Sequence, residues 1–121
     1  MTEIPNSKRY DLEERTYQFA KSVVLFCKKL PRTISNIEYI KQVVRSSGSV
    51  GANYIEANEA LSKKDFKMRV KICRKEAKES AHWLRLIVET NSQNFASEGN
   101  NLLGEANELK KIFSSIIEKS A

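Results

Sequence analysis

The sequence has few residues that break helices and no apolar run long enough to cross a membrane. Its 121 residues include 4 glycines and 2 prolines, and both prolines, Pro5 and Pro31, fall outside the long periodic segments. This scarcity argues against a β architecture with many turns. No segment approaches the ~18 consecutive apolar residues of a membrane span, and the polar start, 1–9, lacks a signal peptide's apolar stretch. We therefore expect a cytoplasmic protein with no membrane partner.

Cysteine and histidine are also scarce, which excludes most site chemistry. Cys27 and Cys73 lie on separate apolar helix faces, so we expect buried, reduced thiols. Glu79 and His82 form Glu-x-x-His, half of a di-iron pattern, but the chain has no second histidine. Two cysteines and one histidine cannot complete a zinc site either. With no nucleophile motif and no phosphate-binding glycine loop, we expect no enzyme activity, no metal or cofactor, and no small-molecule substrate.

Apolar residues recur at helical spacing along most of the chain, in a composition that is 40% hydrophobic and 30% charged. Pro31 ends the first periodic segment, and Ser35 with Glu38 forms a capping box before the second. Ser62 with Asp65 marks another helix start. We predict one all-α domain, 1–121, folded as an antiparallel up-down-up-down four-helix bundle. Its helices are expected at about 11–29, 36–61, 63–91 and 101–119.

The second predicted helix has an unusually small middle. Its expected inner positions are Ile37, Ile40, Val44, Ser47, Gly51, Tyr54, Asn58 and Leu61. Two glycines inside a helix cost about 1 kcal/mol each relative to alanine. Close approach of a neighbouring helix would offset that cost, and a loop at 46–51 is the alternative.

The third predicted helix divides into three faces when residues are placed 100° apart. The core face contains Phe66, Val70, Cys73, Ala77, Ser80, Leu84 and Ile87. A second face is also apolar and contains Met68, Ile72, Trp83 and Leu86. Because a bundle helix needs one apolar face, we predict that the second face is an interface between copies of the chain. The alternatives are a broad core face or coverage by the loop near Phe95.

The third face is basic and accounts for the charge of the chain. Nine basic and three acidic residues lie between 63 and 85, a surplus equal to the whole chain's formal charge of +6. The predicted nucleic-acid-binding residues are Lys67, Lys71, Arg74, Lys75, Lys78 and Arg85. Repeated around an oligomer, this face would attract phosphates. The alternative is a solvated face that binds nothing. Without stacking aromatics along it, backbone or shape recognition is favoured over base reading.

Polar residues form a further pattern on the second helix. Arg45, Asn53 and Glu56 share one stripe with Ser49, and Arg45 could pair with Glu56 through an intervening side chain. On the surface such a pair contributes only about 0–1 kcal/mol. Between subunits it would align the chains.

Two segments closely resemble the characteristic motifs of a bacterial four-helix-bundle family. One is 42–57, which contains Arg45, Asn53 and Glu56; the other is 75–86, which contains Glu76 and Glu79. The family is named for proteins encoded within intervening sequences of 23S rRNA genes, and it is similar to accessory proteins of diversity-generating retroelements. The match spans about 11–117. The resemblance implies an antiparallel four-helix bundle, a ring-like homo-oligomer such as a pentamer, and a role with RNA or DNA. It supplies no catalytic residue, and it leaves the role of the five polar residues open.

From these observations we expect a homo-oligomeric, non-enzymatic accessory protein that contacts structured RNA through the basic face. The alternative is a homo-oligomeric protein-interaction scaffold with no nucleic-acid role.

Overall fold

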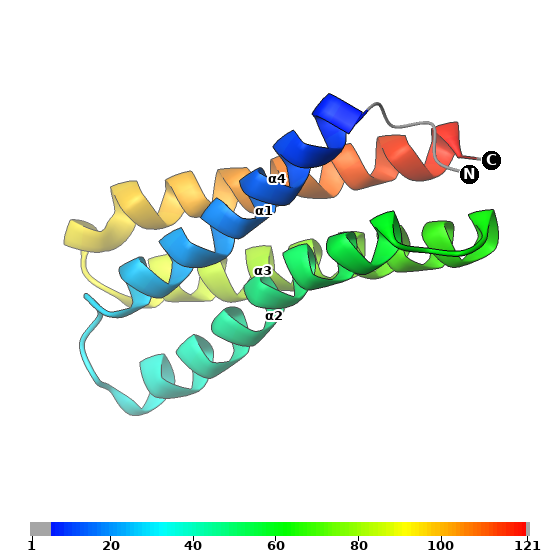
Figure 1. The fold of residues 1–121 in the computed structure, drawn as a ribbon. Helices are drawn as coiled ribbons and strands as arrows, with labels where there is room; N and C mark the ends of the chain where they lie inside the picture. The colour runs from blue at the N-terminus through cyan, green and yellow to red at the C-terminus, as the bar shows by residue number, and fades with distance from the viewer. Residues whose placement is uncertain (1–5, 121) are drawn as a thin grey trace.

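The computed structural model describes residues 6–120, with side chains from residue 11 onward, and these residues are almost entirely helical (Figure 1). The all-α bundle prediction is therefore confirmed, while residues 1–5 and 121 of the predicted domain lie outside the described part. Within 6–120 no helix is both long and apolar enough to cross a bilayer. The elements are α1 (Asn6–Cys27), α2 (Ile34–Asn58), α3 (Lys63–Thr90), a short 3-10 turn η1 (Gln93–Phe95) and α4 (Ala96–Lys119).

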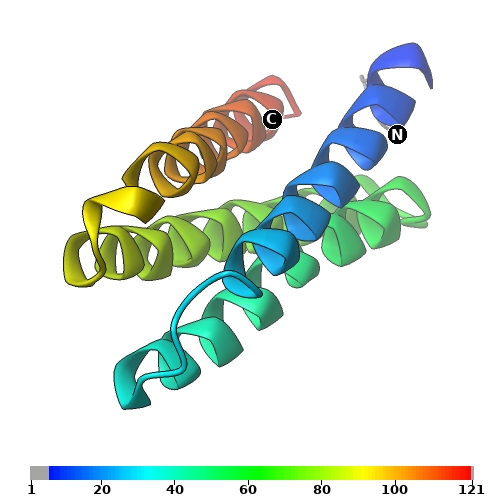
Figure 2. The same ribbon diagram turned by 90° about the vertical axis from the view of Figure 1, so that its left-hand side faces the viewer.

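Cross-helix contacts show how the helices follow one another along the bundle. Asn58 at the end of α2 donates to Glu13 near the start of α1, with 2.7 Å between Nδ2 and Oε2. Just after α1, Lys29 pairs with Glu98 in the first turn of α4, at 3.0 Å. The α1–α2 and α3–α4 links accordingly share one end of the bundle, opposite the α2–α3 turn (Figure 1). Seen from the side, α1 crosses the other helices obliquely (Figure 2).

The core is built from large apolar side chains of all four helices. Every residue of the predicted α3 core face is buried, which confirms that assignment. The rings of Tyr54 on α2 and Phe113 on α4 meet across the core with centroids 5.9 Å apart. The largest fully buried side chains are Tyr54, Phe19, Phe26, Phe66, Phe113, Leu84, Ile87, Leu109, Val23, Val43, Val50 and Val70.

The predicted inner face of α2 is partly wrong. Val44 is 37% exposed and Leu61, which lies beyond the end of the helix, is 99% exposed, whereas Val43 and Val50 are fully buried. The buried face is rotated because α2 is contacted by α3 on one side and by α1 on the other. On the α3 side lies buried Ser46, which the prediction left outside the inner positions.

The small residues of α2 allow both neighbours to approach closely, and the helix is continuous through 46–52. The hydroxyl oxygens of Ser46 and Ser80 lie 2.8 Å apart between α2 and α3. On the other side, a Cβ added at Gly51 would lie 3.0 Å from Oγ1 of Thr16 on α1. The close-approach interpretation is confirmed at Gly51 but not at Gly48, where an added Cβ would meet nothing within 4 Å, and the alternative of a loop is wrong.

Several predicted helix boundaries need correction. α1 extends over Asn6–Cys27 instead of about 11–29. α2 begins earlier because the hydroxyl of Thr33, not Ser35, accepts the backbone N–H of Asn36 at 3.1 Å. It also ends at Asn58 instead of residue 61. α4 begins at 96 instead of 101, because its polar first turns pack Gly99 tightly against α3. The predicted Ser62 cap is confirmed, since its side chain accepts the N–H of Asp65 at 3.0 Å.

Two asparagines fasten the beginning of α2 to the end of α3. Nδ2 of Asn36 donates to Oδ1 of Asn91 at 2.8 Å, and Nδ2 of Asn91 donates back to Oδ1 of Asn36 at 2.9 Å. Asn36 also donates to the carbonyl of Pro31 at 2.9 Å, and Asn91 to that of Ile87 at 2.8 Å. Asn36 is therefore a buried polar residue whose amide is satisfied.

Candidate nucleic-acid interface

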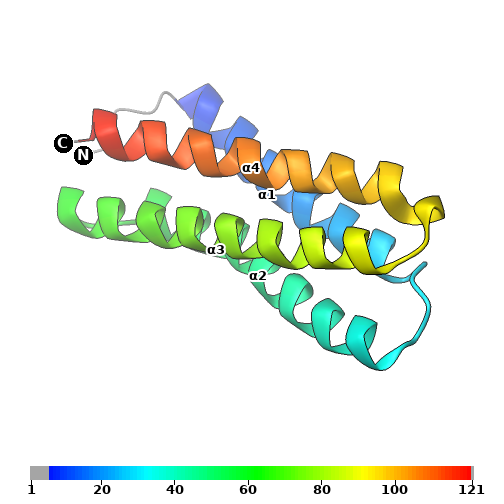
Figure 3. The same ribbon diagram turned by 180° about the vertical axis from the view of Figure 1, so that it is seen from behind.

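The basic face of α3 lies on the outside of the bundle. α3 is at the front of the view from behind, with α4 above it and α1 farther back (Figure 3). Lys71 and Lys78 are exposed, and Lys67 and Arg74 are partly exposed. None of these four cations forms an ion pair with a carboxylate in the described part of the chain. We call these four residues the basic row.

The helix spaces the basic row evenly. At 1.5 Å of rise per residue, neighbours three or four positions apart are about 4.5–6 Å apart along the axis, and the row extends over roughly 16 Å. An aligned row of unpaired cations creates a positive potential along one line of the surface. Such a row suits a polyanion that lies along the helix better than a single small anion.

The other two predicted contact residues are partly occupied by acids. Nε of Arg85 lies 3.1 Å from Oε2 of Glu89, and Nζ of Lys75 lies 3.9 Å from Oε2 of Glu76. Both cations are exposed, so these pairs are weak and can reorganise. The sequence prediction did not separate them from the basic row, although partners one and four residues further along are visible in the sequence.

On the side of α3 that contacts α2, two glutamates of α3 pair with one arginine of α2. Arg45 of α2 hydrogen-bonds Glu79 through Nη2, and its Nη1 lies 3.6 Å from Oε1 of Glu76. Glu76 is buried, and its Oε1 has no hydrogen bond among the described residues. Within the subunit Arg45 does not pair with Glu56, which is exposed and has no ion pair within residues 11–120; a pairing between subunits stays a prediction. Arg45 instead lies on the side of α2 that faces α3.

Asn53 continues this polar contact between α2 and α3. Its Nδ2 donates to the carbonyl of Ser49 at 2.9 Å and to the Ser49 hydroxyl at 3.1 Å. Its Oδ1 accepts from Nη1 of Arg69 at 3.5 Å. Of the five polar residues singled out in the sequence, four therefore join α2 to α3 within one subunit.

The predicted interface on α3 is more covered than its sequence pattern indicated. Met68 is 48% exposed, but Ile72, Trp83 and Leu86 are partly buried. The Trp83 ring lies 6.0 Å from that of Tyr39 on α2 and packs against the core cluster, which supports the alternative of a broad core face. Its Nε1 donates to Oε2 of Glu79 at 3.3 Å, which ties the ring to the Arg45 cluster.

An apolar surface that the sequence reasoning missed lies on α1 and α2. Tyr17 on α1 is 60% exposed, and on α2 Ile55 is 51% exposed, with Val44 and Ile37 also exposed on the same side of that helix. Val44 and Ile55 are 11 residues apart, or three helical turns, so helical periodicity could have placed them on one side. Val44 was instead assigned to the core, which hid the pattern.

Both thiols are protonated at neutral pH. Burial raises the pKa of Cys27 to about 11 and that of Cys73 to about 12. Protonated thiols are poor nucleophiles and poor metal ligands. Among the described residues, no group of three or more histidine, cysteine, aspartate and glutamate side chains could hold a metal ion.

Comparison with known proteins relates this helical bundle to one family. A model of the 23S rRNA-intervening sequence protein family matches residues 8–115. Among solved structures, the chain is similar to a protein of unknown function from the S23 ribosomal protein family of Bacteroides thetaiotaomicron. The two share 29% identity with a TM-score of 0.74, over 87% of this chain and 96% of that one. The comparison with curated proteins gives no match. Since the family model covers most of its length, the chain belongs to the 23S rRNA-intervening sequence protein family.

Proposed function

We propose that this protein is a non-enzymatic, homo-oligomeric accessory protein of the cytoplasm that binds structured RNA through the basic row of α3. The observation that carries the proposal is the row itself: Lys67, Lys71, Arg74 and Lys78 lie on an outer helix face without ion pairs in residues 11–120. The family's name associates its members with an intervening sequence of 23S rRNA, which favours RNA as the polyanion.

The recognition we propose is of backbone and shape. His82, four residues beyond Lys78 on the same helix, packs edge-on against Trp83 with ring centroids 4.8 Å apart. It is thus engaged within the subunit, and the row itself contains no aromatic residue on which an unpaired base could stack. Phosphate contacts release counterions, so four contacts per subunit give a slope of log affinity against log salt of about −3 to −4.

A salt titration with an RNA hairpin and a matched duplex tests this proposal. We expect binding at about 50 mM salt that weakens steeply by about 200 mM. Reversing three charges of the row (Lys71→Glu, Arg74→Glu and Lys78→Glu) should abolish binding. The control carries the same charge change on exposed residues of α1 and α4: Lys21→Glu, Lys111→Glu and Lys119→Glu. Equal loss in both variants, or affinity independent of salt, would contradict the proposal.

The second candidate function is a protein-interaction scaffold, which the exposed apolar side chains of α1 and α2 favour. Tyr17, Val44 and Ile55 present apolar surface of the kind that protein partners cover. Pull-down with the charge-reversed variant separates the functions. A scaffold retains its protein partner when the basic row is reversed, whereas the RNA-binding protein loses its ligand.

Self-association is expected through one of these two apolar surfaces, with a mass near that of five subunits. Trp83→Ala with Ile72→Ser should yield smaller particles in light scattering if the α3 surface is the interface. Val44→Ser with Ile55→Ser is the matched pair on the other surface. A smaller mass for the second pair alone would refute the α3 interface and assign the contact to α2.

A further inference from the structure

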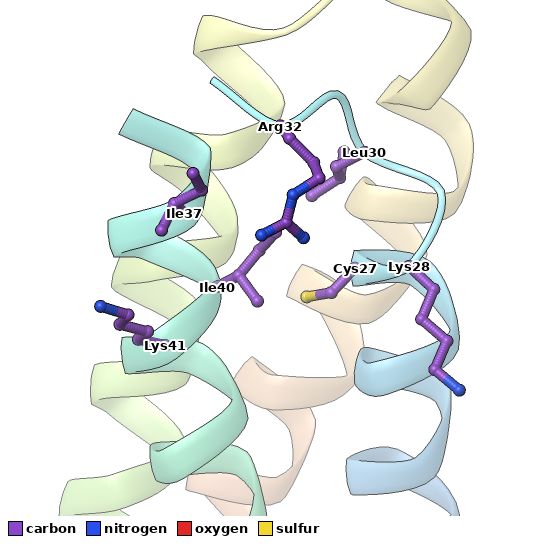
Figure 4. Close-up of a pocket in the computed structure, with 7 residues that line it drawn as sticks. All are labelled: Cys27, Lys28, Leu30, Arg32, Ile37, Ile40 and Lys41. Carbon is purple, nitrogen blue, oxygen red and sulfur yellow. The ribbon is translucent and has the colours of Figure 1, made fainter. Parts of the chain in front are cut away.

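A pocket of about 330 Å³ opens where the end of α1, the α1–α2 link and the first turns of α2 meet (Figure 4). It lies on the α1–α2 side of the bundle, whereas the basic row lies on the outer side of α3. The volume of the pocket is near the lower end of the size range of small-molecule sites. Its lining residues are Cys27, Lys28, Leu30, Arg32, Ile37, Ile40 and Lys41.

The inner wall of this pocket is apolar. Cys27 and Leu30 are buried, and both pack into the core cluster. Ile40 packs against the same cluster, and Ile37 lies at the more exposed edge. The Cys27 thiol is neutral because burial raises its pKa to about 11. An occupant therefore gains by placing hydrocarbon against this wall.

The rim of the pocket is cationic. Lys28 and Arg32 belong to the α1–α2 link and Lys41 to α2, and all three are exposed. None of them has an ion pair in the described part of the molecule, whereas the adjacent Lys29 is bound to Glu98. In the close-up, the Arg32 guanidinium lies between Leu30 and Ile40, and the ammonium groups of the two lysines point outward on either side (Figure 4).

We propose that this pocket binds a small amphiphilic carboxylate, with its hydrocarbon body on the apolar wall and its carboxylate on Arg32. The planar guanidinium can bind a carboxylate through two parallel hydrogen bonds, which a lysine cannot do. Lys28 and Lys41 add positive potential around the mouth of the pocket. A medium-chain fatty acid has this combination of charge and size. The proposal is independent of RNA binding, because the two sites share no residue.

Calorimetric titration with decanoate below its micelle concentration tests the ligand class. Decanol and decyltrimethylammonium test the charge, and acetate tests the hydrocarbon body. We expect decanoate to bind at least about tenfold more tightly than decanol and decyltrimethylammonium, the ratio that one charge-assisted hydrogen bond supplies. It should also bind at least about tenfold more tightly than acetate, which lacks the hydrocarbon that the apolar wall buries. Equal affinity for decanol would overturn the role of the cations. Equal affinity for acetate would overturn the role of the apolar wall, and no decanoate binding would overturn the proposal.

Variants and the two thiols locate the site. Arg32→Gln should weaken decanoate binding about tenfold without changing the decanol affinity. Lys29→Gln is the matched control, since it removes a neighbouring charge outside the pocket. Bound decanoate should also slow alkylation of Cys27, read by mass spectrometry, while Cys73 serves as the internal reference. Equal weakening by both glutamine variants, or equal protection of both thiols, would refute this location.

Discussion

Two glycines of α4 offer a direct test of the packing between α3 and α4. A Cβ added at Gly99 would lie 2.5 Å from Cγ2 of Val88 and 3.2 Å from Cζ of Phe26. A Cβ added at Gly104, five residues further along the same helix, would meet nothing within 4 Å. The same substitution, glycine to alanine, therefore enters a filled space at one position and open space at the other.

The expected magnitudes follow from two opposing effects. Alanine favours a helix over glycine by about 1 kcal/mol, so Gly104→Ala should raise the free energy of unfolding by about that amount. At Gly99 the same gain is offset by overpacking, which costs about 1–3 kcal/mol. The free energy of unfolding of Gly99→Ala should therefore be about 1–3 kcal/mol lower than that of Gly104→Ala. The gain in helix propensity is the same in both variants and cancels in this difference.

Urea unfolding of both variants, at several protein concentrations to account for self-association, measures this difference. Adding Val88→Ala to Gly99→Ala removes the nearest methyl group and should recover part of the loss. If Gly99→Ala stabilises the protein as much as Gly104→Ala, the contact between α3 and the first turns of α4 is wrong.

Three further predictions concern single side chains. Thr33→Ala should lower the free energy of unfolding, measured in urea, by about 1 kcal/mol, whereas Ser35→Ala should change it little. A larger loss in Ser35→Ala than in Thr33→Ala would favour the Ser35 cap expected from the sequence. Asn36→Ala should lower the free energy of unfolding by about 1–3 kcal/mol and increase hydrogen exchange at the end of α3, because the amide of Asn91 loses its partner. Unchanged exchange at the end of α3 would contradict the mutual hydrogen bonds. The Cys73 thiol has an ordinary pKa of 9.0 and a folded pKa of about 12, so its contribution to stability is complete below pH 9 and is lost as pH rises toward 12. Thermal melts should therefore decline less steeply above pH 9 in Cys73→Ala, and parallel declines would refute the shift.

The sequence predicts the helices of this fold well because the chain has strong periodicity and few breakers. The α3 core face was predicted in full, since Phe66, Val70 and Leu84 repeat at helical spacing. The Ser62 cap followed from Asp65 three residues later. In each case a local pattern is sufficient to determine the local structure.

Positions that depend on neighbouring helices were less predictable. Val44 and Leu61 are apolar but exposed, because the buried face of α2 is set by where α1 and α3 pack against it. Likewise, Arg45 pairs across to Glu79 on α3, and the sequence along α2 contains no signal for that partner. The start of α4 was missed because its polar first turn is helical through packing of Gly99, not through its own apolar pattern.

Of the predicted site, the basic row follows from charge and helical spacing alone, but the covering of Trp83 does not. Tyr39 lies on a different helix, 44 positions earlier in the chain, and its contact with Trp83 depends on how α2 and α3 cross. The pocket at the α1–α2 link was not predicted either. It is formed by a turn, by the end of one helix and by the start of another, which no periodicity relates.

The polar contacts between α2 and α3 restrict how these helices can slide past each other. The Ser46–Ser80 pair lies near the middle of the hairpin and the Asn36–Asn91 pair at one end, so both must align at once. A slip of one turn, about 5.4 Å, would bury these groups without partners, although apolar side chains would still meet apolar side chains. The two pairs thus fix the register of α2 against α3. Substitutions that make the interior of this hairpin wholly apolar are expected to yield several packings in place of one.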